Sequence, residues 1–164
     1  MRYFWYFAPV LFLLNSCSLS FKGIVVPEGV ESFYIESLED ITSNSPPMYT
    51  VNLLEDMSNK FRKDSRLKYI EQGADMVFNC KVIEFGVSSQ AANAEGYSSL
   101  NRLTISLEVE SKFDKDEKKS WKKNFTRYVD YDANINFDSE SERLTKEVNA
   151  LLIQDVFNVA FSDW

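Results

Sequence analysis

The sequence predicts an α+β fold, a two-layer sandwich in which two helices pack on one face of a four- to five-stranded, mostly antiparallel sheet. Three observations predict it. Asn101 to Phe113 alternates apolar and polar residues, which is the period of a strand with one dry face and one wet face. Thr50 to Asp64 and Ser139 to about Ala160 carry apolar residues at helical spacing. A chain of 164 residues is enough for one such domain and not comfortably for two.

The first part of the predicted domain is a strand followed by a helix. Ser32 to Leu38 is expected to be the strand, and a polar loop with two prolines follows it. The helix, Thr50 to Asp64, ends in basic residues, and cations suit the negative end of a helix dipole. These basic residues are Lys60, Arg62 and Lys63. The apolar stripe of the helix is expected to contain Val51, Leu54, Met57, Ser58 and Phe61, with Leu53 beside it.

The remaining strands follow this helix. Leu67 to Glu71 and Asp75 to Gly86 are expected to be strands, and Cys80 falls on the apolar face of the second one. We interpret Cys80 as a small buried hydrophobe, with an intermolecular disulfide as the alternative. Ser88 to Ser99 is small and polar, and is either a loop or a continuation of two paired strands. Asn101 to Phe113 and Trp121 to Tyr131 then form a hairpin around a charged turn.

The last helix is expected to begin at Ser139, because Ser139 and Glu142 have the spacing of a capping box. Its apolar stripe is expected to contain Leu144, Val148, Leu151, Leu152, Ile153, Asp155, Val156 and Val159. Packing both helices on one face leaves the other face of the sheet polar, as the wet residues between Arg102 and Glu110 require.

The first residues have the pattern of a lipoprotein signal. The apolar run from Tyr3 to Leu14 follows a positive charge, and it is shorter than the roughly 20 residues that span a bilayer. Leu14-Asn15-Ser16-Cys17 resembles a lipobox, so we expect cleavage before Cys17 and lipidation of that cysteine. The alternatives are an ordinary signal peptide with an incidental cysteine, and a core helix at an unprocessed end. The sequence thus divides into a signal peptide (1–16), a lipidated leader (17–31) and a single domain (32–164).

The residues after Cys17 indicate where the anchor places the domain. Ser18 does not resemble the aspartate that retains lipoproteins in the inner membrane of enterobacteria, and Leu19 to Gly23 lacks the acidic run of a surface-export signal. Two or more acyl chains hold a protein stably on a membrane. We therefore expect a lipid-anchored protein of the outer membrane that faces the periplasm.

Composition argues against several classes of function. The chain has no histidine, which removes Ser-His-Asp catalysis and histidine metal sites. Its formal net charge of −7 argues against nucleic acid. The acidic group from Asp114 to Glu117 stands beside lysines in a turn. The Asp and Asn residues at every second position from Asp130 to Asp138 lack the glycine and glutamate of a calcium loop. We expect no catalytic residue, no metal and no cofactor.

Basic residues gather at the end of the first helix and along the hairpin. They form either a solubilising face or a surface that contacts anionic lipid head groups. The hairpin group consists of Lys118, Lys119, Lys122, Lys123 and Arg127.

Four segments in collinear order resemble the Bacteroidota branch of LptE, the lipopolysaccharide-assembly lipoprotein. They are Phe21-Lys22-Gly23-Ile24 with Pro27; Leu100-Asn101-Arg102-Leu103-Thr104; Phe125-x-Arg127-Tyr128-x-Asp130-Tyr131-Asp132; and Val156-Phe157-Asn158-x-Ala160-Phe161-Ser162-x-Trp164. The resemblance covers nearly the whole mature chain. Glu39 to Ser45 departs from it, because this stretch lacks an Asn-x-Ala turn.

The resemblance implies a small α/β sandwich and a non-enzymatic partner of LptD, the outer-membrane barrel that inserts lipopolysaccharide. It implies that the lipoprotein sits in the barrel lumen as a plug, helps the barrel assemble and can bind lipopolysaccharide. For the lipid A phosphates we expect Arg102, Lys122, Lys123 and Arg127. Two rival hypotheses remain open: a free-standing periplasmic-facing scaffold or binding lipoprotein unrelated to lipopolysaccharide, and a lipoprotein enzyme that uses carboxylates.

Overall fold

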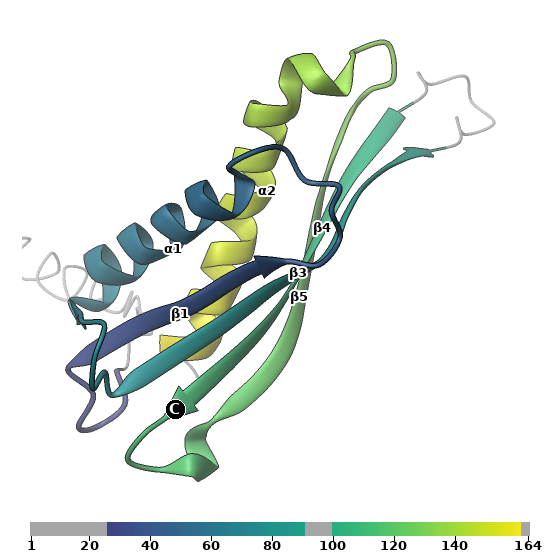
Figure 1. The fold of residues 1–164 in the computed structure, drawn as a ribbon. Coiled ribbons are helices and arrows are strands. Elements are labelled where there is room, and N and C mark those ends of the chain that lie inside the picture. The colour runs from purple at the N-terminus through teal and green to yellow at the C-terminus, as the bar shows by residue number, and fades with distance from the viewer. Residues whose placement is uncertain (1–25, 91–99, 162–164) are drawn as a thin grey trace, which may run out of the picture.

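A computed structural model describes residues 26–90 and 100–161, so Cys17 and the predicted signal peptide lie outside the described residues. The described chain forms a five-stranded sheet with two helices on one face (Figure 1). In chain order the elements are β1 (Ser32–Asp40), α1 (Tyr49–Ser65), β2 (Lys68–Tyr69), β3 (Met76–Gln90), β4 (Leu100–Phe113), the 3-10 helix η2 (Glu117–Lys119), β5 (Trp121–Asp132) and α2 (Phe137–Phe161). The predicted fold class is confirmed. Neither α1 nor α2 combines the length and the apolar character that crossing a membrane would require.

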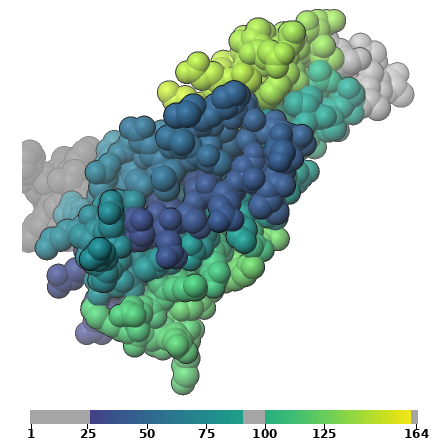
Figure 2. All heavy atoms as spheres, in the orientation of Figure 1, coloured from purple at the N-terminus to yellow at the C-terminus, as the bar shows by residue number. Residues whose placement is uncertain are grey.

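The sheet is mixed, with strand order β2-β1-β3-β4-β5. β3, β4 and β5 pair antiparallel, whereas β1 runs parallel to both β2 and β3. Parallel neighbours need a crossover connection, and α1 supplies it between β1 and β3. In the space-filling view, α1 and β1 lie together on the near side (Figure 2).

One residue of β3, Ile83, has no partner on β4, because Val82 pairs with Leu107 and Glu84 already pairs with Ser106. The extra residue resets the alternation of the strand. Phe85 therefore enters the core as Val82 does, while Glu84 is exposed. Without this bulge, the strict alternation from Phe78 onward would turn Glu84 toward the core.

The core lies between the sheet and the helices, and Phe61 is at its centre. The ring of Phe61 lies 5.6 Å from that of Phe33 on β1 and 5.2 Å from that of Phe78 on β3, measured between centroids. On α2 it contacts Phe157 and Phe161 at 5.8 and 5.4 Å. This one side chain thus joins both layers of the sandwich.

The buried stripe of α1 differs from the predicted one. Tyr49 and Leu53 are buried with Met57, Ser58 and Phe61, whereas Val51 is 49% exposed. The prediction that placed Val51 in the stripe and Leu53 beside it was wrong. Because α1 begins at Tyr49, the positions at i, i+4 and i+8 from that residue face the sheet.

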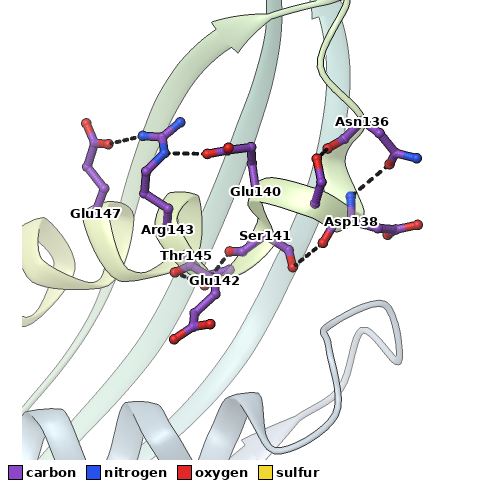
Figure 3. Close-up of polar contacts among 9 residues, drawn as sticks. Asn136, Asp138, Glu140, Ser141, Glu142, Arg143, Thr145 and Glu147 are labelled. Atoms are coloured by element: carbon purple, nitrogen blue, oxygen red, sulfur yellow. Dashed lines mark hydrogen bonds and ion pairs between the residues drawn. The ribbon is translucent and has the colours of Figure 1, made fainter.

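The start of α2 was also predicted wrongly. The helix begins at Phe137, and the side chain of Asn136 accepts a hydrogen bond from the Asp138 N–H at 2.9 Å (Figure 3). Asn136 is therefore the N-cap, a position that asparagine and serine fill equally well. Ser139 lies inside the first turn, where its hydroxyl donates to the Asn136 carbonyl at 2.7 Å. Within the predicted stripe of α2, Leu151 is exposed and Asp155 is only half-buried.

The segment predicted as either a loop or continued strands is described in its first part. β3 extends to Gln90, which pairs with Leu100, so the continued-strand interpretation is right for Ser88 to Gln90. The rest of the segment lies outside the described residues.

Cys80 is fully buried as predicted, and burial raises the pKa of its thiol to about 12.

Candidate functional site

The face of the sheet that carries no helix is the candidate functional site, and we call it the open face. On β4 it consists of the residues that alternate with the buried core residues Leu103, Ile105, Leu107 and Val109. These open-face residues are Arg102, Thr104, Ser106, Glu108 and Glu110. The predicted division of this strand into an apolar face and a polar face is confirmed.

Polar side chains on the open face bind one another across the strands. The hydroxyl of Ser106 donates to the Glu84 carboxylate on β3 at 2.6 Å and lies 2.8 Å from the hydroxyl of Thr126 on β5. Ser106 is only 3% exposed, because these two neighbours cover it. The bonds tie three strands together, so the open face is an ordered polar surface rather than a set of independent solvated side chains.

Arg102, the first of the four predicted lipid A residues, is engaged within the open face. Its guanidinium donates two hydrogen bonds to Asp130 on β5, at 2.6 and 2.8 Å, and lies 3.7 Å above the ring of Tyr128. The Arg102 hydrogen bond lowers the pKa of Asp130 and raises that of Arg102 itself. A phosphate would have to displace this carboxylate.

Lys122 and Lys123 are neighbours in sequence but point to opposite sides of the sheet. Lys122 pairs in register with Glu110 on the open face, and its ammonium lies 2.9 Å from Glu108. The hydrogen bond to Glu108, with the charge of Glu110 nearby, raises the pKa of Lys122. Lys123 pairs in register with the buried Val109 and therefore lies on the helix side. It makes no ion pair with any residue in the described ranges.

Arg127 also lies on the helix side, because it pairs in register with the buried Ile105. Its guanidinium donates two hydrogen bonds to Asp155 on α2, at 2.5 and 2.9 Å, and this contact raises the pKa of Arg127. The pair links the edge strand to the helix, and it explains why an acidic residue stands in the apolar stripe of α2. The structure thus brings Arg102 and Lys122 to one face, and places Lys123 and Arg127 on the other.

A shallow hollow of about 810 Å³ opens where β1 and β3 begin and β4 ends. It is lined by Tyr34 and Val77 together with acidic side chains and Lys112. The acidic residues are Glu36, Glu71, Asp114 and Glu117, and all four are exposed to solvent. Among the described residues, no group of three or more His, Cys, Asp or Glu side chains is placed to hold a metal ion.

The start of β1 is held by Asp75, a residue that the sequence analysis did not single out. Its carboxylate accepts hydrogen bonds from the backbone N–H groups of Glu31 and Ser32, at 2.9 and 3.1 Å, and from the Ser32 hydroxyl at 2.8 Å. The Lys115 ammonium, 2.6 Å away, also donates to the Gly29 carbonyl. Asp75 and Lys115 therefore fix the point at which the leader enters the domain.

Asp75→Asn is expected to lower the free energy of unfolding by about 1–3 kcal/mol at neutral pH. Lys115 and the Glu31 N–H hold the pKa of Asp75 well below its ordinary value of 3.8. A depressed pKa stabilises the fold above the unfolded-state pKa, and this stabilisation is lost as the pH falls through the folded-state value. The difference between the wild type and the variant should therefore shrink below about pH 4, as measured by urea denaturation.

Asp56→Asn, on the exposed side of α1, is the matched control and should change the free energy of unfolding by less than about 0.5 kcal/mol. A difference between Asp75→Asn and the wild type that stays constant from neutral pH to about pH 2 would show that the Asp75 charge does not act as described.

Comparison with known proteins gives a likeness of fold and none of sequence. No protein-family model matches the chain, and no curated protein matches its sequence. A minor lipoprotein from Acinetobacter baumannii matches with a TM-score of 0.51 and 13% identity, over 79% of this chain and 92% of that one. The described chain therefore shares its fold with a bacterial lipoprotein.

Two further structures extend this likeness. The hypothetical protein CT253 from Chlamydia trachomatis has a TM-score of 0.57 at 8% identity, over 80% of this chain and 98% of that one. A PelC L103M dodecamer from Paraburkholderia phytofirmans has a TM-score of 0.51 at 12% identity, over 87% of this chain and 94% of that one. Because this chain spans nearly the full length of each, the shared unit is the whole domain.

Proposed function

We propose that the protein is a non-enzymatic, lipid-anchored subunit of the outer-membrane lipopolysaccharide translocon. In this role it faces the periplasm, occupies the lumen of an LptD-like barrel, assists the assembly of that barrel and binds lipopolysaccharide. The collinear LptE resemblance indicates the partner, and the lipobox at Cys17 indicates the anchor. The likeness of fold to a bacterial lipoprotein supports the general class.

The open face is the observation that carries the proposal. The interior of an outer-membrane barrel is polar, so a plug needs a polar, ordered surface to lie against it. β4 and β5 supply such a surface at alternate paired positions, from Arg102 opposite Asp130 to Glu110 opposite Lys122. Asn124, Thr126 and Tyr128 project from β5 and are exposed.

Lipid A phosphates are proposed to bind at Arg102 and Lys122 on the open face, and at Lys123 and Arg127 on the helix side of the sheet. The first, second and fourth each hold a carboxylate of this chain, so binding there requires an exchange of one anion for another. Lys123 is exposed and needs no such exchange. Within this proposal, Lys123 makes the first contact with a phosphate.

Purification of the tagged protein in detergent from its native outer membrane tests the proposal. An LptD-like barrel is expected to co-purify. Asn124→Trp places a bulky side chain on the open face and is expected to reduce the recovered barrel by about tenfold, the effect of roughly 1.4 kcal/mol lost at an interface. Asn52→Trp, on the exposed side of α1, is the matched control and should leave the yield unchanged.

Absence of any barrel from the wild-type preparation would contradict the plug and favour a free-standing scaffold or binding lipoprotein. Normal surface lipopolysaccharide in a depletion strain would contradict the transport role.

An enzyme that uses carboxylates is the weaker rival. Such a mechanism needs one carboxyl kept protonated by a desolvated site, and the four acidic residues of the hollow are exposed.

A further inference from the structure

One end of the domain gathers the elements that lie nearest the predicted anchor, and we call it the leader end. β1 begins there, and β2 pairs with its first residues through Ser32 opposite Lys68. α1 and α2 both finish there, because Phe61 and Phe161 pack on each other at 5.4 Å (Figure 1). The opposite end holds the start of α2, where Phe137 packs on Phe85.

The leader end carries a group of exposed basic residues that we call the basic corner. It consists of Arg62, Lys63, Arg66 and Lys68. Within the described residues, none of the four makes an ion pair, and the nearest acid in sequence, Asp64, is bound by Lys60 at 2.5 Å. This arrangement contrasts with the open face, where Arg102 and Lys122 are each bound by a carboxylate.

The shape of the chain keeps these charges together. Arg66 adopts a left-handed conformation with φ 63° and ends α1, so the chain reverses and brings Lys68 beside β1. The backbone N–H of Lys68 then donates to the Glu31 carbonyl of the leader at 3.0 Å. Helix-dipole compensation accounts for cations in the last turn of α1, such as Lys63, but not for Arg66 and Lys68, which lie beyond it.

The acidic neighbours do not cancel the basic corner. Glu31 lies beside it through the bond from the Lys68 N–H, and Glu71 follows Lys68 by three positions, so the four basic residues outnumber these two acids. The β4–β5 turn at the same end, residues 114–119, holds equal numbers of acidic and basic residues. The chain as a whole is acidic, with a net charge of −7, so the corner stands out against the rest of the surface.

Distance relates this corner to the anchor. Val26 follows Cys17 by nine positions, and a chain of that length reaches at most about 30 Å. α2 alone, with 25 residues, is about 37 Å long. The nine positions between Cys17 and Val26 therefore keep the leader end of the domain near the bilayer. They are too few to let the opposite end of the domain contact the bilayer instead.

We infer that the basic corner docks on anionic phospholipid head groups of the membrane that holds the Cys17 anchor, and that it sets the orientation of the domain on that surface. The inference rests on the proposed lipid anchor, and it adds a second, electrostatic contact. Anionic bilayers attract exposed Lys and Arg, and this attraction acts within about 10 Å of the surface at ordinary ionic strength. Docking at this corner leaves the open face free for a protein partner.

Lysine acetylation of the lipidated, full-length mature protein in vesicles tests the inference. Vesicles of phosphatidylcholine alone are compared with vesicles that also contain phosphatidylglycerol, and each lysine is followed by mass spectrometry. Lys63 and Lys68 are expected to react at least about fivefold more slowly on the anionic vesicles. Lys146, on an exposed side of α2, should react equally on both. High salt should remove the difference.

Two variants with equal loss of charge sharpen the test. Lys63→Gln with Arg66→Gln is expected to abolish the protection of Lys68. Lys81→Gln with Lys146→Gln removes two exposed cations elsewhere and should retain it. Equal reactivity of Lys68 on both vesicles, protection of Lys146 as strong as that of Lys68, or protection that survives Lys63→Gln with Arg66→Gln would each overturn the inference.

Failure of the anchor is recognised separately in the same samples. The intact mass of the protein reports acylation of Cys17, so an unacylated chain contradicts the proposed anchor. An acylated chain without protection of Lys68 contradicts only the docking. Loss of the barrel in the detergent purification affects neither readout.

Discussion

Phe61→Ala is expected to lower the free energy of unfolding by about 3–5 kcal/mol, the usual cost of deleting a fully buried aromatic ring. Phe61 is fully buried, and its ring contacts four other phenylalanines on β1, β3 and α2. Truncation removes those contacts and leaves a cavity that a sheet and two helices cannot easily close. Because a domain of this size is stable by only about 5–15 kcal/mol, urea denaturation should show a much lower midpoint.

Val51→Ala is the control in the same helix. Its side chain is 49% exposed although the apolar spacing of the sequence placed it in the core. The control should cost less than about 0.5 kcal/mol. Similar losses for Phe61→Ala and Val51→Ala would mean that α1 presents a different face to the sheet.

In cells depleted of the barrel, Cys17→Ala is expected to remove the protein from the outer-membrane fraction, with a loss of at least about a hundredfold. Each buried methylene of an acyl chain contributes about 0.8 kcal/mol, so the charged contacts of the basic corner alone do not substitute for the chains. The variant should also keep residues 1–16, because cleavage before position 17 and lipidation both require the lipobox cysteine. Membrane fractionation and intact mass measure the two effects.

Cys80→Ala is the matched control, since it changes the other cysteine of the chain. Cys80 is buried in β3, and its removal should leave the membrane location and the acyl mass unchanged. An outer-membrane location for Cys17→Ala in cells depleted of the barrel would contradict the anchor on which the proposed function depends.

The fold was largely predictable because apolar residues recur in most of its strands and helices at the spacing typical of that element. The alternation in β4 and β5 and the spacing of Leu144, Val148 and Leu152 each identify one face without knowledge of the partner. The parallel pairing of β1 was not predictable in the same way. The direction of this pairing depends on where the chain re-enters the sheet after α1. No local pattern in Ser32 to Asp40 indicates that position. The bulge at Ile83 was missed for the same reason.

The candidate site was predictable in its surface but not in its contacts. Alternation alone puts Lys123 and Arg127 on the same face of the sheet as Phe125, which is the face that Arg102 does not share. The sequence was therefore enough to assign the four basic residues to two different faces. The carboxylates that bind three of these basic residues could not be predicted from the sequence. Asp155 lies 28 positions from Arg127, and only the packing of α2 on β5 brings the two together.

The parallel pairing of β1 also has a consequence for the order in which the domain folds. β3, β4 and β5 are consecutive in the chain, so their antiparallel pairing can begin next to each turn, as with Gln90 and Leu100 or Ser111 and Trp121, which lie ten positions apart. β1 leaves the ribosome before them, yet its hydrogen-bond partners on β3 lie more than forty positions later, as the pairing of Phe33 with Met76 shows. Until β3 arrives, Phe33 and Ile35 have no sheet to bury them. For the exported protein proposed above, this interval falls during translocation, and β1 then stays extended and unpaired, with its apolar side chains uncovered, until β3 follows.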